Sequence, residues 1–161
     1  MFARPKDKAG VYCRLRAKLR MAVCAICVSF GLTLFSDAAF ADRITVQAAY
    51  DAAKDGRIDL IDIRRPSEWA KTGVPDGATP ITMHQGLNRF VGLMKARQAA
   101  NGGRPVALIC RAGVRSKRMH DRLKRAGVKV IDVSAGLSGN RRGDTGWVRA
   151  GLPVRKWSPK E

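Results

Sequence analysis

Cysteine is scarce in this sequence, and its positions limit the sulfur chemistry that is open to the chain. Of the four cysteines, Cys13, Cys24 and Cys27 lie before residue 42, and only Cys110 follows. If the first 41 residues are removed, the remaining chain can form no internal disulfide and no cysteine metal cluster. An unpaired thiol is a liability in an oxidising compartment, so the presence of Cys110 needs a chemical explanation.

Long apolar runs are also lacking. The run near the N-terminus covers 21–35, and its 15 residues fall short of the roughly 20 that span a bilayer. It follows a basic stretch and precedes Ala39-Phe40-Ala41, a small-residue pattern that is typical of a secretory cleavage site. We therefore expect a signal peptide over 1–41, one domain over 42–161 and a periplasmic location. The alternative is an uncleaved anchor, the only case in which we expect contact with a membrane.

Acidic and aromatic residues are few. The chain has 13 Asp and Glu against 31 Lys and Arg, a net charge of +18, of which +13 remains on 42–161. Such a charge favours anionic partners and rapid capture of small anions. Because aromatic residues make up only 6% of the chain and an exported protein rarely meets nucleic acid, we expect no nucleic-acid partner.

Short apolar runs alternate with amphipathic stretches along the rest of the chain. The apolar runs predict strands at 58–63, 81–83, 106–109 and 128–133. Helical spacing and capping residues predict helices at 46–55, 66–69, 87–100 and 116–126, with a loop at 73–80. Strands separated by helices indicate an α/β domain with a parallel sheet. Ligands of such sheets bind at the carboxyl ends of the strands, where Asp62 and Cys110 both lie.

Cys110 follows a predicted strand, and Arg111 and Arg115 lie on the way into the next helix. A tight strand-to-helix loop turns its backbone N–H groups toward its centre, and the positive end of the helix adds to this cradle for an anion. The cradle favours the reactive thiolate form of cysteine, and the two arginines stay charged at any relevant pH. Gly113 lets the loop turn where a Cβ would crowd the bound atom. The alternative interpretation of Cys110 is a small buried residue at a strand end.

The loop Cys110–Ser116 resembles the active-site loop of rhodanese domains, which are sulfurtransferases that carry sulfur as a cysteine persulfide. The resemblance covers roughly 44–157 and includes four further segments of the sequence: Leu60–Arg64, Glu68–Trp69, Gly73–Ala78, and Gly136 with Trp147 and Gly151–Pro153. The sequence departs from the family pattern at Gly73, where histidine is usual, at the inserted Asp76, and in a longer link at 141–146. The exported single-domain arrangement is most similar to the phage-shock-protein-E type.

The resemblance implies a three-layer fold, with a central, mostly parallel sheet and helices on both faces. It also implies that Cys110 attacks the outer sulfur of an anionic donor such as thiosulfate and passes that sulfur to cyanide, a thiol or a protein. No metal or other cofactor is implied. The expected substrate-binding residues are Arg111, Ala112, Gly113, Val114 and Arg115. The expected loop-supporting residues are Asp62, Arg64 and Ser116, with Asp62 ordering the loop by pairing with an arginine.

Two other functions stay open. Cysteine phosphatases and related arsenate reductases place five residues between cysteine and arginine, whereas four separate Cys110 from Arg115 here, which favours the sulfur-handling loop. A sulfur carrier or anion-binding module without efficient turnover is the non-enzymatic alternative. The stretch from Arg111 to Lys129 has eight Lys and Arg against one Asp. It is either a solvated helix face, a steering surface for the donor, or a docking face for an acidic protein.

Overall fold

The structure is a computed structural model, and it describes residues 41–159. The predicted signal peptide lies outside the described residues apart from Ala41, and so do Cys13, Cys24 and Cys27. Within residues 41–159, no helix has the length and apolar character required to cross a membrane.

Five short parallel strands form the central sheet, in the order β1-β6-β5-β2-β4. All four residues of the central strand β5 are buried, and β5 pairs with β2 on one side and with β6 on the other. Cys110 therefore leaves the sheet at the middle of its carboxyl edge. The strands are Arg43–Ile44 (β1), Asp59–Asp62 (β2), Thr79–Pro80 (β4), Val106–Ile109 (β5) and Val130–Val133 (β6).

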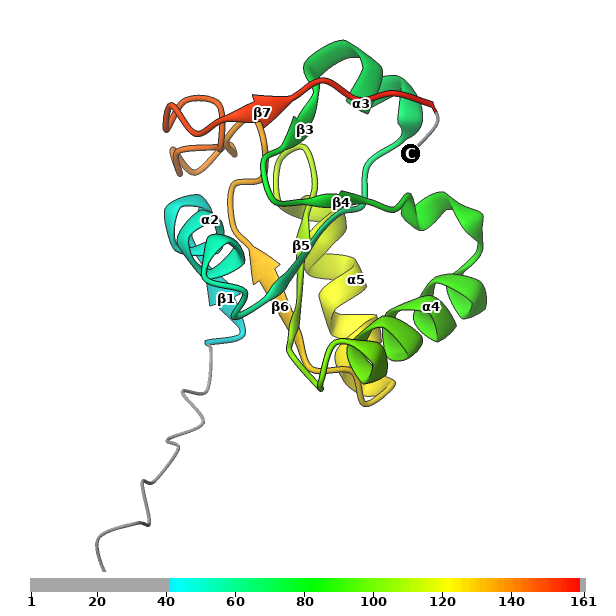
Figure 1. The fold of residues 1–161 in the computed structure, drawn as a ribbon. Coiled ribbons are helices and arrows are strands. Elements are labelled where there is room, and N and C mark those ends of the chain that lie inside the picture. The colour runs from blue at the N-terminus through cyan, green and yellow to red at the C-terminus, as the bar shows by residue number, and fades with distance from the viewer. Residues whose placement is uncertain (1–40, 160–161) are drawn as a thin grey trace, which may run out of the picture. The chain divides into compact units, whose positions relative to one another are not determined.

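Helices cover both faces of this sheet (Figure 1). The α2 helix (Val46–Lys54) packs on one face, and α4 (Leu87–Ala100) and α5 (Val114–Arg125) pack on the other. Side chains along a strand alternate between the two apolar clusters, so Leu60 faces α2 whereas Ile61 faces α4 and α5. The predicted α/β class and three-layer arrangement are confirmed.

A second, two-stranded sheet lies beside the short helix α3 (Pro66–Thr72). It pairs β3 (Val74–Pro75) with β7 (Val154–Arg155) in antiparallel fashion. Trp147 holds the segment that leads into β7, because its indole N–H donates to the Pro153 carbonyl at 2.9 Å and its ring packs edge-on against Tyr50. The C-terminal segment is thereby fixed to the rest of the domain.

The structure corrects the region that follows β2. The strand predicted at 81–83 is wrong, because β4 ends at Pro80 and a 3-10 turn (η1, Met83–Gln85) follows. The Thr82 hydroxyl accepts the His84 N–H at 3.2 Å and so caps this turn. The stretch 73–80, predicted as loop alone, contains both β3 and β4.

The remaining elements were predicted with small errors at their ends. The error that bears on the Cys110 loop concerns α5, which begins at Val114 rather than at Ser116. Gly113 adopts a left-handed conformation (φ 78°) and is the residue that precedes the first helical turn. The strands β2 and β6 are shorter than predicted, α2 ends one residue early, and α3 extends beyond the predicted 66–69 to Thr72.

Candidate functional site

The Cys110 loop connects the end of β5 to the start of α5. Its sulfur lies at the base of this connection, and Cys110 is only 1% exposed. The backbone N–H of Ser116, in the first turn of α5, donates to the Cys110 sulfur at 3.4 Å. A strand-to-helix loop of this kind directs helix N-terminal amides at the group it encloses. The Ser116 N–H is thus one amide of the predicted cradle that reaches the Cys110 sulfur.

The Ser116 side chain forms a second contact with the cysteine. Its hydroxyl oxygen lies 3.5 Å from the Cys110 sulfur and 3.2 Å from the Gly113 carbonyl oxygen, to which it donates. With a neutral thiol, the sulfhydryl donates to the Ser116 oxygen; with a thiolate, the hydroxyl proton can turn toward the sulfur instead. Ser116 is fully buried and thus supports the loop from within.

The segment after β6 holds the loop from the other side. The Leu137 N–H donates to the Cys110 carbonyl, and the Ser138 N–H donates to the Arg111 carbonyl, both at 2.8 Å. A Cβ on Gly136 would overlap the Cys110 carbonyl oxygen, so only glycine permits this approach. Next to it, Ala135 has a left-handed φ of 65°, which is uncommon for a residue other than glycine. The loop backbone is therefore held on a rigid support.

Arg115 forms an ion pair with Glu68 that joins α5 to α3. The two terminal guanidinium nitrogens donate to the two carboxylate oxygens at 2.6 and 2.7 Å. These hydrogen bonds lower the pKa of Glu68 to about 2, and they raise the pKa of Arg115. Both side chains are about one quarter exposed. Arg115 is thus a fixed positive charge at the loop, although its terminal nitrogens already have a partner.

Asp62 and Arg64 form a second ion pair, which is completely buried. Arg64 Nη2 lies 2.6 Å from an Asp62 oxygen, and its Nε contacts both carboxylate oxygens at 2.9 Å. The same guanidinium donates to Thr72 Oγ1 and to the Gly73 carbonyl, both at 2.7 Å. Asp62 therefore pairs with an arginine, as predicted, but that arginine lies on its own strand end and fixes the end of α3.

The predicted site residues thus fall into three groups. Cys110, Gly113 and Ser116 are buried in the base of the loop. The rim holds the other loop residues, of which two are exposed and two partly buried: Arg111 and Val114, and Ala112 and Arg115. Asp62 and Arg64 lie at the end of β2, where Asp62 is next to Ile109 of β5, and Arg64 also holds the end of α3, which carries Glu68 in its first turn.

Glu68 is the residue whose role sequence reasoning missed. It was noted within a motif, but its partner Arg115 lies 47 residues away. The available signal was local: an acidic residue in the first turn of a helix, where it also accepts the Arg65 N–H at 3.1 Å.

Neither histidine reaches the Cys110 sulfur by a hydrogen bond. His84 is exposed on η1, and partial desolvation of its ring together with the charges of Arg65 and Arg115 lowers its pKa. His120 is buried on α5, and its Nδ1 lies 3.0 Å from Asp121. In residues 41–159, no three His, Cys, Asp or Glu side chains are grouped so as to hold a metal ion.

The fold and the site define a class of protein: a parallel α/β domain whose central strand delivers a buried cysteine to the start of a helix. The model of the rhodanese-like domain family matches residues 45–141 of the chain. This match covers more than half of the 161 residues, and the chain belongs to the rhodanese-like domain family.

Solved structures with the same fold include three informative relatives. The protein Rv0390 from M. tuberculosis is 28% identical with a TM-score of 0.57, and the match covers 73% of this chain and 99% of that one. A rhodanese-related protein from Thermoplasma volcanium is 21% identical, with a TM-score of 0.50 and coverage of 71% and 98%. A possible tyrosine phosphatase from Rhodopseudomonas palustris is 22% identical, with a TM-score of 0.52 and coverage of 70% and 83%. The last two show the fold alone. Among curated proteins, no significant match is found.

Proposed function

We propose that the protein is a sulfurtransferase that carries sulfane sulfur as a persulfide on Cys110. The observation that carries this proposal is the buried Cys110 sulfur, which receives the Ser116 N–H at 3.4 Å inside a loop of four residues between cysteine and arginine. Such a loop can enclose a persulfide, whose terminal sulfur is a small anion that backbone amides stabilise. Membership of the rhodanese-like domain family supports the same chemistry.

The proposed reaction proceeds by covalent catalysis in two steps. The Cys110 thiolate attacks the outer sulfur of thiosulfate, a new S–S bond forms, and sulfite leaves with the electron pair of the broken S–S bond. An acceptor nucleophile then attacks the outer sulfur of the persulfide, and Cys110 leaves as the thiolate. Cys110 is the only cysteine of 42–161, so the acceptor comes from outside this domain.

The arginines divide the binding of the donor between them in this proposal. Arg111 is exposed on the rim and can reach the charged oxygens of the donor. Arg115 supplies a fixed charge while Glu68 holds it in place. Because the Glu68 carboxylate offsets much of this charge, Arg115 assists the anionic donor mainly by keeping the start of α5 in position, and Arg111 makes the direct contact.

Sulfur transfer from thiosulfate to cyanide, together with the intact mass of the protein, tests the proposal. Wild-type protein should gain the mass of one sulfur atom after incubation with thiosulfate and lose it again when cyanide is added. Cys110→Ser should lose both signals. A protein that shows neither transfer nor a sulfur adduct with any sulfane donor would overturn the proposal. An adduct without turnover would favour the carrier alternative, and hydrolysis of an aryl phosphate would favour the phosphatase alternative.

We also propose that the domain 42–161 acts in the periplasm after removal of 1–41. The basic stretch, the apolar run at 21–35 and Ala39-Phe40-Ala41 support this proposal, which rests on the sequence. Mass spectrometry of the protein from an exported fraction tests it, because a mature N-terminus at Asp42 is expected. An intact N-terminus in a membrane fraction would favour the anchor.

A further inference from the structure

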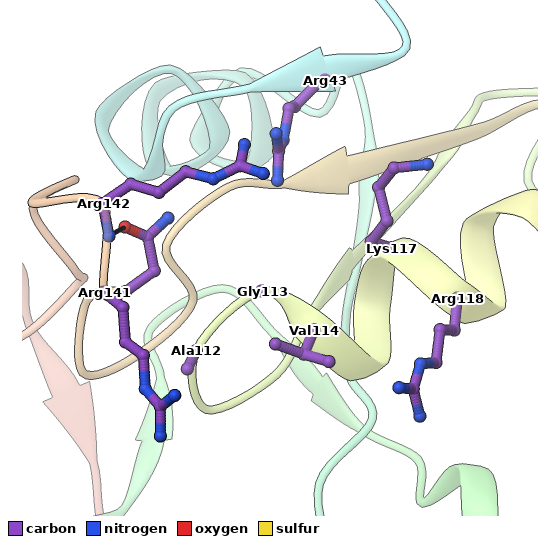
Figure 2. A pocket seen from close by; sticks show the side chains of 9 residues that line it. Arg43, Ala112, Gly113, Val114, Lys117, Arg118, Arg141 and Arg142 are labelled. Atoms are coloured by element: carbon purple, nitrogen blue, oxygen red, sulfur yellow. Dashed lines mark hydrogen bonds between the residues drawn. The ribbon is translucent and has the colours of Figure 1, made fainter.

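A pocket of about 550 Å³ lies next to the Cys110 loop, and all of its charged lining residues are cations. Three separate segments form its wall: the start of β1, the Cys110 loop with the first turns of α5, and the loop at 140–142 (Figure 2). A volume of several hundred Å³ is typical of ligand sites. The five cations of the wall are Arg43, Lys117, Arg118, Arg141 and Arg142.

Within residues 41–159, most of this positive charge is not neutralised by ion pairs. Arg43 pairs with the buried Asp132, and Lys117 pairs with Asp121. Within residues 41–159, the side chains of Arg118, Arg141 and Arg142 have no carboxylate within ion-pair distance, although all three line the pocket. Figure 2 shows the Arg142 side chain extending toward Arg43. Like charges that line one hollow without carboxylate partners favour an anionic occupant.

The loop at 140–142 holds its two arginines in a defined backbone geometry. The Asn140 side-chain oxygen accepts the N–H groups of Arg142 and Asp144, at 3.0 and 3.2 Å. The Asn140 amide in turn donates to the Asp144 carboxylate at 2.6 Å, which closes the turn. The Asp144 carboxylate is therefore hydrogen-bonded within this loop.

The pocket shares a wall with the proposed sulfur site. Ala112, Gly113 and Val114 line the pocket, and they follow Cys110 directly in the loop. Val114 is 58% exposed, a large apolar side chain on the rim between the cations and the loop that holds Cys110. An apolar contact surrounded by charged groups is the usual arrangement of a protein interface.

The charge and size of the pocket argue against a single small donor as its occupant. The two charges of a dianion such as thiosulfate neutralise at most two of the guanidinium groups, and so small an ion would leave most of the volume empty. Three unpaired arginines on two segments instead fit several carboxylates carried on one chain, since the planar guanidinium matches carboxylate geometry. The occupant also has to bring a nucleophile to Cys110, because Cys110 is the only cysteine of 42–161.

We propose that this pocket docks an acidic segment of a protein that accepts sulfur from Cys110. The proposal rests on the proposed sulfurtransferase function and names the chemical class of its acceptor. The acidic side chains of the segment pair with Arg118, Arg141 and Arg142, and Val114 contacts an apolar residue beside them. A cysteine thiolate of the partner attacks the outer persulfide sulfur; the new S–S bond forms on the partner, the old one breaks, and Cys110 leaves as the thiolate.

Binding tests the docking surface without requiring turnover. The probe is a fluorescent peptide with several Asp and Glu, one Leu and one Ser in place of the acceptor cysteine, titrated with the Cys110→Ser protein. The triple variant R118Q/R141Q/R142Q should bind it about tenfold more weakly, since each exposed ion pair contributes modestly. The matched control is R122Q/R125Q/R149Q, which removes the same charge from exposed positions outside the pocket and should bind nearly as well as the parent.

Sulfur delivery provides the second readout. The wild-type protein, loaded with sulfur on Cys110, should transfer that sulfur faster to the Cys-containing form of the peptide than to a charge-reversed Cys peptide that has Lys in place of Asp and Glu. R118Q/R141Q/R142Q should remove this preference while its discharge to cyanide stays unchanged. If the protein never acquires sulfur, the proposed function fails, and the binding titration still decides whether the pocket recognises acidic chains.

Three results would overturn the docking proposal. One is equal loss of binding in the two triple variants, which would mean that only the net charge matters. Another is tight binding of inorganic tripolyphosphate together with no binding of the acidic peptide, which would make the pocket a site for a small polyanion. The third is sulfur transfer to acidic and basic thiol peptides at the same rate in low salt, where ion pairing is strongest.

Discussion

The two sides of the Cys110 loop use arginine in different ways. On the α3 side, Arg64 pairs with Asp62 and Arg115 pairs with Glu68, so each guanidinium has a carboxylate inside the domain. On the pocket side, within the described residues, Arg118, Arg141 and Arg142 have no such partner. Charges that are paired and buried fix geometry, whereas exposed unpaired charges keep their field available for a ligand. The α3 side should therefore determine the stability of the domain, and the pocket side should determine its binding of anionic ligands.

The largest effect should follow from removing Arg64 on the α3 side. Arg64→Ala leaves the Asp62 carboxylate buried without its partner and breaks the contacts to Thr72 and Gly73. Breaking a buried pair in this way costs about 3–5 kcal/mol of unfolding free energy. Denaturant titration measures the loss, with the exposed Arg122→Ala as the control at less than about 0.5 kcal/mol. Equal losses in the two variants would break the distinction between buried and exposed charge.

The segment after β6, which supports the Cys110 loop through Gly136, should be nearly as sensitive to substitution. Gly136→Ala forces a methyl group against the Cys110 and Arg111 backbone at a left-handed φ of 59°. Overpacking of this kind costs about 1–3 kcal/mol. Gly143→Ala is the matched control, since Gly143 also has a positive φ but has no atom near its added Cβ. We expect Gly136→Ala to lose more stability and to slow persulfide formation. If the two variants behave alike, the close contact at Gly136 does not position the loop.

The elements of the fold differ in how accurately the sequence predicts them. Strands that are buried on both faces, such as β2 and β5, have continuous apolar runs and were predicted to within one or two residues. The Cys110 loop was located because its residue types and spacing are local. The start of α5 was placed two residues late and β4 was missed, since a left-handed Gly113 and the Thr82 cap act through the backbone.

Contacts between distant segments could not be predicted from the sequence. The pairing of Glu68 with Arg115 spans 47 residues, and β3 meets β7 across an even longer stretch. The sequence pattern of each segment does not identify its partner, because these contacts depend on how distant elements are arranged in the folded domain. The pocket likewise needs three segments together. From the sequence alone, the basic face of α5 stayed open between solvation, steering and docking.

A smaller effect, and one that depends on pH, is expected for the Glu68–Arg115 pair. The pKa of Glu68 is about 2 in the folded protein against 4.5 ordinarily, so the carboxylate is stabilised by folding. The contribution is present above pH 4.5 and is lost as the pH falls through about 2. Glu68→Gln should cost about 1–2 kcal/mol at neutral pH. The difference from wild type in denaturant titrations should shrink between pH 4.5 and 2 and stay constant above pH 5, and a difference that grows on acidification would contradict the pairing.

The smallest effect on stability is expected on the pocket side. Neutralising Arg142 removes a charge that lies among like charges and has no carboxylate partner in the described residues, so R142Q should change the unfolding free energy by less than about 0.5 kcal/mol. The sign of this change in unfolding free energy distinguishes the pocket side from the α3 side. Removing repulsion should make R142Q slightly more stable than wild type at low salt, and added salt should abolish the gain, because screening acts on exposed charges. Glu68→Gln should be destabilising under the same conditions. Destabilisation of R142Q at low salt would mean that the pocket arginines stabilise the fold. It would contradict the proposed difference between the two sides of the loop.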